Sequence, residues 1–386
     1  YSLMIILPTL RISNCLKLQN QSGSDWPSLD SRPLPKWFDS AKFGIFIHWG
    51  IYSVPSFYNE WFWWYWKGSK AKDSIKEFMK QNYPSVKKYT EFAQNFTAGK
   101  FVPDDWATLF RESGAKYVVF TTKHHEGFSN WPSKVHGNWN AATDGPHQDL
   151  VGAMATAVRK QNLTFGVYYS LFEWFSMNYQ EDKKKNYASN EYVKHKVHPQ
   201  LLELINTYKP DVLFSDGDFG PSNYWNATNF LAWLYNESPV KDTIVTNDRW
   251  GTDEVHNKHG DYFCPEHEPI NTITHKWENC ITLDKQSWGY RRNMVDSDVL
   301  TVNEVLTMLI RSISKGGNLL LNIGPTADGM IPQIFQQRLR KIGKWMQING
   351  EGIYDSRPWI FHKDGANNVW YTRKGKYIYA FVLTEP

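Results

Sequence analysis

The chain has 386 residues, with 43 Lys and Arg against 39 Asp and Glu, which gives a net charge of +4. This length suits one large α/β barrel, which alone needs about 250 residues, together with a small second domain. The charges are spread without long runs, so neither a polybasic arm nor an acidic tail is present, and nucleic acid is disfavoured as a partner.

The first residues, YSLMIILPTLRISNC, contain an apolar run that is too short to span a bilayer. We interpret residues 1–25 as the remnant of a signal peptide and an N-terminal segment, with no membrane span. Sequons of the form N-x-S/T favour the same secretory route, toward the lysosomal lumen or secretion. The sequons lie at Asn20, Asn95, Asn162, Asn226 and Asn236.

From Trp26 onward, short β-branched or aromatic runs alternate with longer segments of helical period. This alternation is typical of βα units around a parallel sheet. Strands are predicted within 42–50, 116–127, 163–170, 211–218, 242–250 and 318–325, and helices within 104–115, 149–162, 198–210 and 303–317. No repeat of solenoid length is visible, so residues 26–349 are predicted to form a (β/α)8-like barrel.

After residue 349 the sequence changes to short alternating stretches, and a Lys-Gly turn joins two of them in NNVWYTRKGKYIYAFVL. This pattern indicates a β-hairpin. Because two strands alone are marginally stable, residues 350–386 either begin a C-terminal β-sandwich that is incomplete in this chain or pack directly on the barrel.

Aromatic residues are unusually frequent, at 16% with 19 Trp, and many stand among polar residues, as in NEWFWWYWKG. This mixture suits a sugar, whose C–H faces lie on aromatic rings while its hydroxyls need donors and acceptors. Plain packing in the core or on the surface is the alternative.

Polar residues collect where predicted strands end, which in a barrel is the side that carries the chemistry. Asp216, in FSDGDFG, follows a buried run, and Gly217 lets the backbone turn away, so that this carboxylate could reach a substrate. An Asp that caps a turn is the alternative, and we favour it for Asp218. The other polar residues at such positions are His48, His124, His125 and Arg249.

Hydrolysis of a glycosidic bond usually needs a second carboxyl group, which protonates the leaving oxygen. The loop GDYFCPEHEP, residues 260–269, offers Asp261, Glu266 and Glu268. Glu278 and Asp284 follow further along the chain.

The adjacent His124 and His125 could ligate a metal, but a third ligand at metal-binding spacing is missing, so hydrogen bonds to vicinal hydroxyls are the preferred interpretation. His48 is either part of the same site or structural. Tyr168 could donate its hydroxyl to the nucleophile or fill the barrel. Arg249 could hold a carboxylate ionised or form a structural ion pair.

Three cysteines, Cys15, Cys264 and Cys280, are too few for a disulfide framework. Cys264 and Cys280 either pair with each other or stay as buried free thiols, and the sequence does not decide between these alternatives.

Six long stretches occur in order along the chain: WFDSAKFGIFIHWGIYSVP, NEWFWWYW, GAKYVVFTTKHHEGFSNWPS, DVLFSDGD, HKWENCITLDKQSWGYRR and GGNLLLNIGPTADG. Together they resemble the α-L-fucosidases of glycoside hydrolase family 29, from about Trp26 to the end, and most closely the animal lysosomal or secreted enzymes. The resemblance implies a retaining hydrolase on a (β/α)8-like barrel followed by a β-sandwich. It also implies two catalytic carboxyl groups, with no metal and no other cofactor.

The resemblance implies that Asp216 is the nucleophile and Glu266 the acid/base. The loop that carries Glu266 aligns only with a gap, and a shifted gap would bring His267 to that position, so Glu278 is kept as the alternative acid/base. The ring of Trp288 is implied to face the C5 methyl group of fucose. The substrate-binding residues, to which we add Tyr168 from its place on its strand, are His48, Glu60, Trp61, His124, His125, Tyr168, Arg249 and Trp288.

On this basis Asp216 would attack the anomeric carbon of a terminal α-L-fucosyl residue while Glu266 protonates the leaving oxygen, and water activated by Glu266 would hydrolyse the fucosyl-enzyme with net retention. The substrate would be a fucosylated glycoprotein, glycolipid or oligosaccharide. One alternative is an inactive fucose-binding protein on the same scaffold, and another is a glycosidase for a related sugar. Trp288 favours fucose, since a C6 hydroxyl against its ring would lose hydrogen-bond partners. The sequence leaves open whether the chain forms a homo-oligomer.

Overall fold

The computed structural model describes residues 23–135, 139–253, 255–265, 274–365 and 368–383. The predicted signal remnant up to residue 22, Cys15 and the sequon at Asn20 therefore lie outside the described residues. The described helices are α1 (Trp26–Asp30), α2 (Lys36–Ala41), α3 (Phe62–Lys67), α4 (Asp73–Asn82), α5 (Pro103–Glu112), α6 (Leu150–Lys160), α7 (Met177–Lys184), α8 (His198–Tyr208), α9 (Ala227–Asn236), α10 (Val302–Ser314) and α11 (Gln333–Asn349). None of these described helices is long and apolar enough to cross a membrane.

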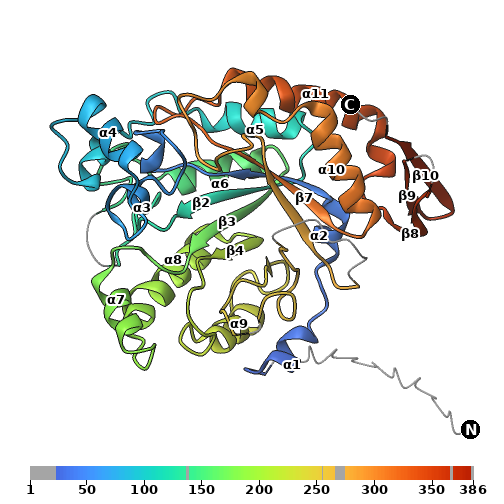
Figure 1. Ribbon diagram of the computed structural model, residues 1–386. Helices are drawn as coiled ribbons and strands as arrows, with labels where there is room; N and C mark the ends of the chain where they lie inside the picture. Colours follow the sequence, from blue (N-terminus) through green and yellow to red (C-terminus); the bar gives the residue numbers. More distant parts are fainter. Residues whose placement is uncertain (1–22, 136–138, 254, 266–273, 366–367, 384–386) are drawn as a thin grey trace, which may run out of the picture.

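A curled sheet of parallel strands forms the centre of the molecule, with helices on its outer face (Figure 1). Its strand order is β5-β4-β3-β2-β1-β7-β6, and every named pair is parallel. The strands are β1 (Phe43–Ile47), β2 (Tyr117–Lys123), β3 (Thr164–Ser170), β4 (Val212–Asp216), β5 (Val245–Thr246), β6 (Glu278–Thr282) and β7 (Asn318–Ile323).

A short segment, residues 261–263, closes this sheet into a barrel. On one side the amide of Asp261 donates to the carbonyl of Thr246 in β5, at 3.1 Å. On the other side Phe263 accepts a hydrogen bond from the amide of Glu278 in β6, at 2.8 Å, and donates to the carbonyl of Lys276, at 2.9 Å. The segment therefore takes the place of an eighth strand, and the predicted (β/α)8-like barrel is confirmed.

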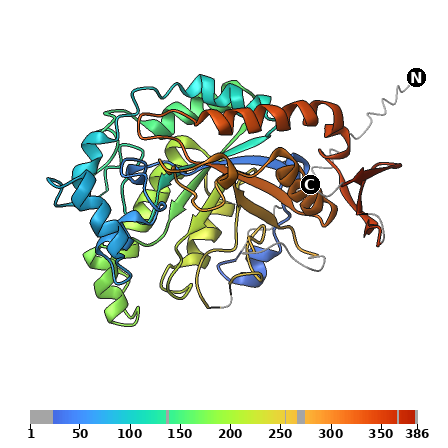
Figure 2. The ribbon, with the colours of Figure 1, turned by 45° about the horizontal axis from the view of Figure 1, so that its top comes forward.

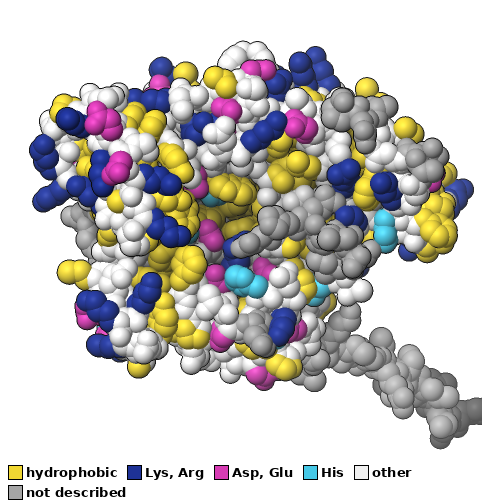
Figure 3. All heavy atoms as spheres, viewed as in Figure 1, with side chains coloured by type: hydrophobic (Ala, Val, Ile, Leu, Met, Phe, Trp, Pro, Cys, Tyr) yellow, Lys and Arg dark blue, Asp and Glu magenta, His cyan; other side chains and the backbone are white. Residues whose placement is uncertain are grey.

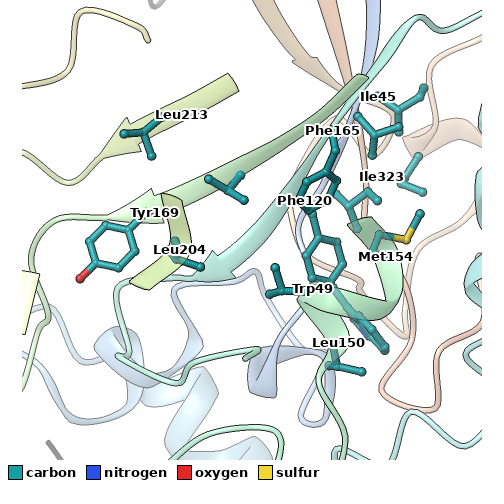
Figure 4. Packing of buried hydrophobic residues seen from close by; sticks show 14 of the residues in the cluster. Ile45, Trp49, Phe120, Leu150, Met154, Phe165, Tyr169, Leu204, Leu213 and Ile323 are labelled. Carbon is teal, nitrogen blue, oxygen red and sulfur yellow. The ribbon is translucent and has the colours of Figure 1, made fainter. Parts of the chain in front are cut away.

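Alternation along each strand divides the core into two layers, because successive side chains in a strand point to opposite faces. Phe46, Val119 and Phe214 pack inside the barrel. Ile45, Phe120, Phe165 and Leu213 point outward into the core under the helices, and Figure 4 shows Phe120 near Met154 of α6. The inner layer fills the barrel below the ends of the strands, so a ligand site can form only above it.

The predicted hairpin is part of a three-stranded antiparallel sheet, with β8 (Arg357–Lys363), β9 (Val369–Lys374) and β10 (Tyr377–Val382) in the order β10-β9-β8. Strands β8 and β9 pack against α10, and Figure 2 shows the small sheet beyond one end of α11. Trp370 of β9 is buried in the main core. The sheet is thus attached to the outside of the barrel.

Candidate active site

The predicted site residues gather in one pocket of about 280 Å³ at the carboxyl ends of the strands. Figure 3 shows that this face of the molecule is hollowed near its centre, with hydrophobic side chains around the hollow. The pocket is lined by His48, Glu60, Trp61, His124, His125, Tyr168, Asp216, Arg249 and Trp288, and also by Phe46, Phe214, Gly217, Phe219, Cys264 and Cys280.

Asp216 is the last residue of β4, and its carboxylate lies in the pocket beside a hydroxyl, an imidazole and a guanidinium. The hydroxyl of Tyr168 donates to Oδ2 at 2.7 Å. His125 Nε2 lies 3.6 Å from Oδ2, and Arg249 Nη1 lies 3.7 Å from Oδ1. Parallel pairing sets Ser170 of β3 opposite Asp216, so Tyr168, two residues earlier, lies on the same face as the carboxylate.

The chain turns sharply after Asp216, at a position that only glycine suits. Gly217 has a φ of +64°, and a Cβ atom there would lie 2.4 Å from the ring of Phe172. The next carboxylate, Asp218, does not line the pocket. It accepts a hydrogen bond from the amide of Gly251 at 2.7 Å and pairs with His256 Nε2 at 2.7 Å. These contacts hold Asp218 among the loops outside the pocket, and its structural role stays a prediction.

Two buried histidines present the same nitrogen atom to the pocket. The Asn322 amide donates to Thr282 and to the carbonyl of Trp288, so its oxygen must accept from His48 Nδ1, at 2.8 Å. The hydroxyl of Ser170 donates to a backbone carbonyl, so it must accept from His125 Nδ1, at 2.7 Å. In a neutral ring, Nε2 is then a hydrogen-bond acceptor at both residues.

Burial keeps both rings in this neutral form. It lowers the pKa of His48 to about 3 and the pKa of His125 well below its usual range, with neighbouring histidines adding to the effect. His124, between them in space, bonds Glu126 through Nδ1 at 3.2 Å. The pocket therefore offers at least two neutral acceptors to the hydroxyl hydrogens of a bound polyol.

Glu60 holds part of the aromatic wall of the pocket in place. Its Oε2 accepts hydrogen bonds from the amide of Trp288 at 2.9 Å and from the hydroxyl of Ser287 at 3.2 Å. The Trp288 ring lies 5.2 Å from the ring of His48, and Trp61 lies 5.4 Å from the ring of His125. Flat apolar surface and hydrogen-bonding groups thus face the same space, as sugar recognition requires.

Arg249 connects the carboxylate to the cysteine side of the pocket. It donates from Nη2 to the carbonyl of Cys264 at 3.4 Å, and its buried Nε has no hydrogen-bond partner among the described residues. Cys264 and Cys280 are free thiols whose sulfur atoms lie 3.3 Å apart. Within the described part of the chain, no three His, Cys, Asp or Glu side chains are grouped so as to hold a metal ion.

The carboxyl groups considered as the acid/base differ in where they lie relative to the pocket. Glu266 lies outside the described residues, as do His267 and Glu268. Glu278 is completely buried below the pocket and does not line it; its carboxylate accepts a hydrogen bond from Tyr117, and burial raises its pKa to about 7. Asp261 and Asp284 form buried ion pairs with Arg32 and Arg291.

Several residues that shape the pocket had no clear signal in the sequence. Glu126 and Asn322 orient two of the histidines, and Phe219 lies at the rim. Glu126 stands two residues after His124, which is the one hint that it could have been found. Asn322 comes from a strand far along the chain, and only the fold brings it to His48.

The known proteins that this chain resembles in sequence and in structure include alpha-L-fucosidases. The model of the family described as Alpha-L-fucosidase matches residues 11–351. Human tissue alpha-L-fucosidase is 53% identical over 365 residues, which cover 94% of this chain and 78% of that protein. Human plasma alpha-L-fucosidase is 52% identical over 367 residues, with the same shares covered. The crystal structure of Thermotoga maritima alpha-fucosidase in complex with fucose has a TM-score of 0.80 and 38% identity, over 92% of this chain and 85% of that one.

Proposed function

The chain belongs to the alpha-L-fucosidase family and is a glycoside hydrolase. We propose that it hydrolyses terminal α-L-fucosyl groups with retention of configuration, and we assign the steps to its own residues. The observation that carries the proposal is the carboxylate of Asp216, which lies in the pocket between a donor hydroxyl and a guanidinium. The related Thermotoga enzyme has been crystallised with a mechanism-based inhibitor, which agrees with covalent catalysis.

In the first step Asp216 attacks the anomeric carbon. Oδ2 is held by the Tyr168 hydroxyl at 2.7 Å, so we assign the attack to Oδ1, which lies 3.7 Å from Arg249. Arg249 places a positive charge beside the carboxylate, and the Tyr168 hydroxyl holds it in one orientation. The bond to the leaving oxygen breaks as the ester to Asp216 forms.

Recognition of fucose relies on the neutral histidines and the aromatic wall. Nε2 of His48 and of His125 accept hydrogen bonds from sugar hydroxyls, and Glu60 accepts another. The ring of Trp288 packs against the C5 methyl group, where a C6 hydroxyl would be buried without a partner. This arrangement selects a deoxy sugar over its hydroxylated counterpart. The substrate is a fucosylated glycoprotein, glycolipid or oligosaccharide.

Glu266 is our choice for the acid/base. Cys264, two residues before it, lines the pocket, whereas Glu278 is fully buried and its carboxylate is occupied by Tyr117. A proton donor has to reach the leaving oxygen within hydrogen-bond distance, which a group below the pocket wall does not do. The same carboxylate then activates the water that hydrolyses the fucosyl-enzyme.

The acid/base assignment predicts that Glu266→Ala depends on the leaving group. For a fucosyl disaccharide, kcat/KM should fall by about 10²- to 10⁴-fold, because the sugar oxygen needs a proton to depart. For a dinitrophenyl fucoside the first step should be nearly unaffected, and azide should give α-fucosyl azide. Glu278→Gln is the matched control and should keep its activity on both substrates; the reverse pattern would assign the role to Glu278.

The proposed function is tested by following hydrolysis of an aryl α-L-fucoside by NMR. Release of fucose with the α anomer formed first is the expected result. If the β anomer appears first, the mechanism is inverting. A folded protein that binds fucose but releases none would be the inactive binding protein on this scaffold.

We further propose that the protein acts in the secretory pathway, in the lysosome or after secretion. The tissue and plasma alpha-L-fucosidases among its relatives support this location. The sequon asparagines Asn95 and Asn162 are exposed, and Asn226 and Asn236 are half-buried, so a glycan can be attached at the first two without rearrangement.

A further inference from the structure

One aromatic ring of the pocket differs from the others in its exposure. Phe219 lines the same pocket as Asp216, yet 47% of it is exposed to solvent. The inner aromatic residues Phe46, Tyr168 and Phe214 are all buried. Phe219 therefore lies at the rim, where the pocket opens.

The backbone that carries Phe219 is firmly held. Asp218 is anchored by the amide of Gly251 and by His256, and the carbonyl of Phe219 accepts a hydrogen bond from the hydroxyl of Tyr179 at 2.9 Å. Gly220, directly after it, has a φ of +138°. Because the turn is held on both sides of Phe219, the phenyl ring stays in one place and remains open to solvent.

The Phe219 ring is also connected to the sugar-binding groups. It packs nearly perpendicular to the ring of Phe172, with centroids 4.9 Å apart and planes at 87°. Phe172 in turn lies 4.8 Å from the ring of His125. The supporting contact leaves ring surface of Phe219 free on the solvent side of the pocket.

We infer that Phe219 is a stacking platform for the first sugar of the leaving group, a pyranose ring that offers an apolar C–H face. The inference rests on the proposed function. The buried end of the pocket holds fucose against Asp216, so the group beyond the glycosidic oxygen must lie toward the opening. An exposed aromatic ring there can cover the C–H face of a sugar.

The test compares two substrates that differ only in the leaving group. Fucosyl fluoride presents no ring to Phe219, whereas a fucosyl-galactose disaccharide does. Phe219→Ala should lower kcat/KM for the disaccharide about tenfold and leave kcat/KM for the fluoride within about twofold. Phe219→Trp should keep the activity on the disaccharide, because its ring is at least as large.

Phe175→Ala is the matched control, since Phe175 is 37% exposed and does not line the pocket. It should leave both substrates unchanged. Equal losses on both substrates in Phe219→Ala, or no loss on either, would overturn the platform. The fluoride also serves as the folding control, and a parent protein that releases no fucose from it would overturn the proposed function instead.

Discussion

The Tyr168 hydroxyl and the Asp216 carboxylate are hydrogen-bonded in the pocket. In the proposed mechanism this bond matters most when the carboxylate leaves the sugar. The Tyr168 hydroxyl donates to Asp216 at 2.7 Å, and burial raises the pKa of Tyr168 well above its usual range, so it keeps its proton. In the second step of the proposed mechanism, Asp216 leaves the sugar as an anion. A donor already in place stabilises that anion without reorganisation.

Tyr168→Phe is therefore expected to slow breakdown of the fucosyl-enzyme. Loss of a hydrogen bond to a charged group costs about 1.5–3 kcal/mol, which corresponds to a fall in kcat of roughly 10- to 150-fold. Stopped-flow measurement with an aryl fucoside should show a burst of released phenol followed by a slow steady state. An unchanged kcat without a burst would contradict this role.

His48 makes the stability of the protein depend on pH. Burial lowers its pKa from 6.5 to about 3, so between these values the unfolded chain binds a proton here and the folded protein does not. The stabilisation is complete above pH 6.5 and is lost as the pH falls toward 3. We expect His48 alone to contribute a slope of about 1.4 kcal/mol per pH unit in that window.

Urea unfolding at a series of pH values measures this slope. The His48→Gln variant cannot titrate at this position, so its free energy of unfolding should fall less steeply below pH 6.5. Parallel curves for the parent and the variant would show that His48 is not the titrating group.

At the scale of secondary structure, closure of the barrel depends on the short segment 261–263. Asp261 accepts hydrogen bonds from the amide of Thr246 and from the hydroxyl of Tyr235, both at 2.9 Å, and pairs with Arg32 at 2.9 Å. One buried side chain thus ties this segment to β5, to α9 and to the N-terminal region.

Asp261→Ala should destabilise the protein by about 3–5 kcal/mol, because it leaves the guanidinium of Arg32 without its counter-charge. The measurement is the free energy of unfolding in urea. Asp73→Ala is the control: its ion pair with Lys76 is exposed, and no measurable loss is expected. Equal behaviour of the two variants would contradict the closing role of Asp261.

The strands that could be predicted from the sequence are those with continuous apolar runs. Phe43–Ile47 and Asn318–Ile323 are buried on both faces, so their composition reveals them. The strand at Glu278–Thr282 carries Glu, Asn and Thr, and no apolar pattern marked it. Residues 261–263 are too few for any pattern to show.

The site was predictable to a similar extent. Asp216 and the histidines stand at strand ends, where barrel geometry directs attention, while roles for Glu60 and Trp288 came only from the family resemblance. Phe219 was missed because its proposed role depends on the solvent exposure of its ring, which the sequence does not reveal. Exposure is set by contacts with Phe172 and Tyr179, which lie 40 or more residues away along the chain.

On the scale of the whole molecule, the small C-terminal sheet is attached to the barrel through the buried side chains of Trp370 and Thr372, and the Thr372 hydroxyl donates to the carbonyl of Gly352 at 2.7 Å. Trp370 is 6% exposed, and the charged ends of Arg311, Lys315 and Lys363 each lie 5.6 Å from its ring. Phe361, in the same sheet, is 60% exposed. The sheet and the pocket are therefore expected to respond separately to mutation.

Trp370→Ala should destabilise the packing of the sheet by about 3–5 kcal/mol, with faster hydrogen exchange in β9 and β10. Phe361→Ala should leave exchange unchanged. Below the unfolding transition, kcat/KM for an aryl fucoside should be the same in both variants. A loss of activity in Trp370→Ala without faster exchange would show that the sheet contributes to the pocket directly.

The proposed role of Asp216 as the nucleophile of a retaining fucosidase can be tested with Asp216→Gly, assayed with and without azide. We expect kcat to fall by about 10⁴-fold, azide to restore release of phenol from an aryl α-L-fucoside, and the product to be β-fucosyl azide. Asp218→Asn, assayed alongside, should need no rescue. Retained activity in Asp216→Gly, or rescue that yields only the α-azide, would contradict the claim.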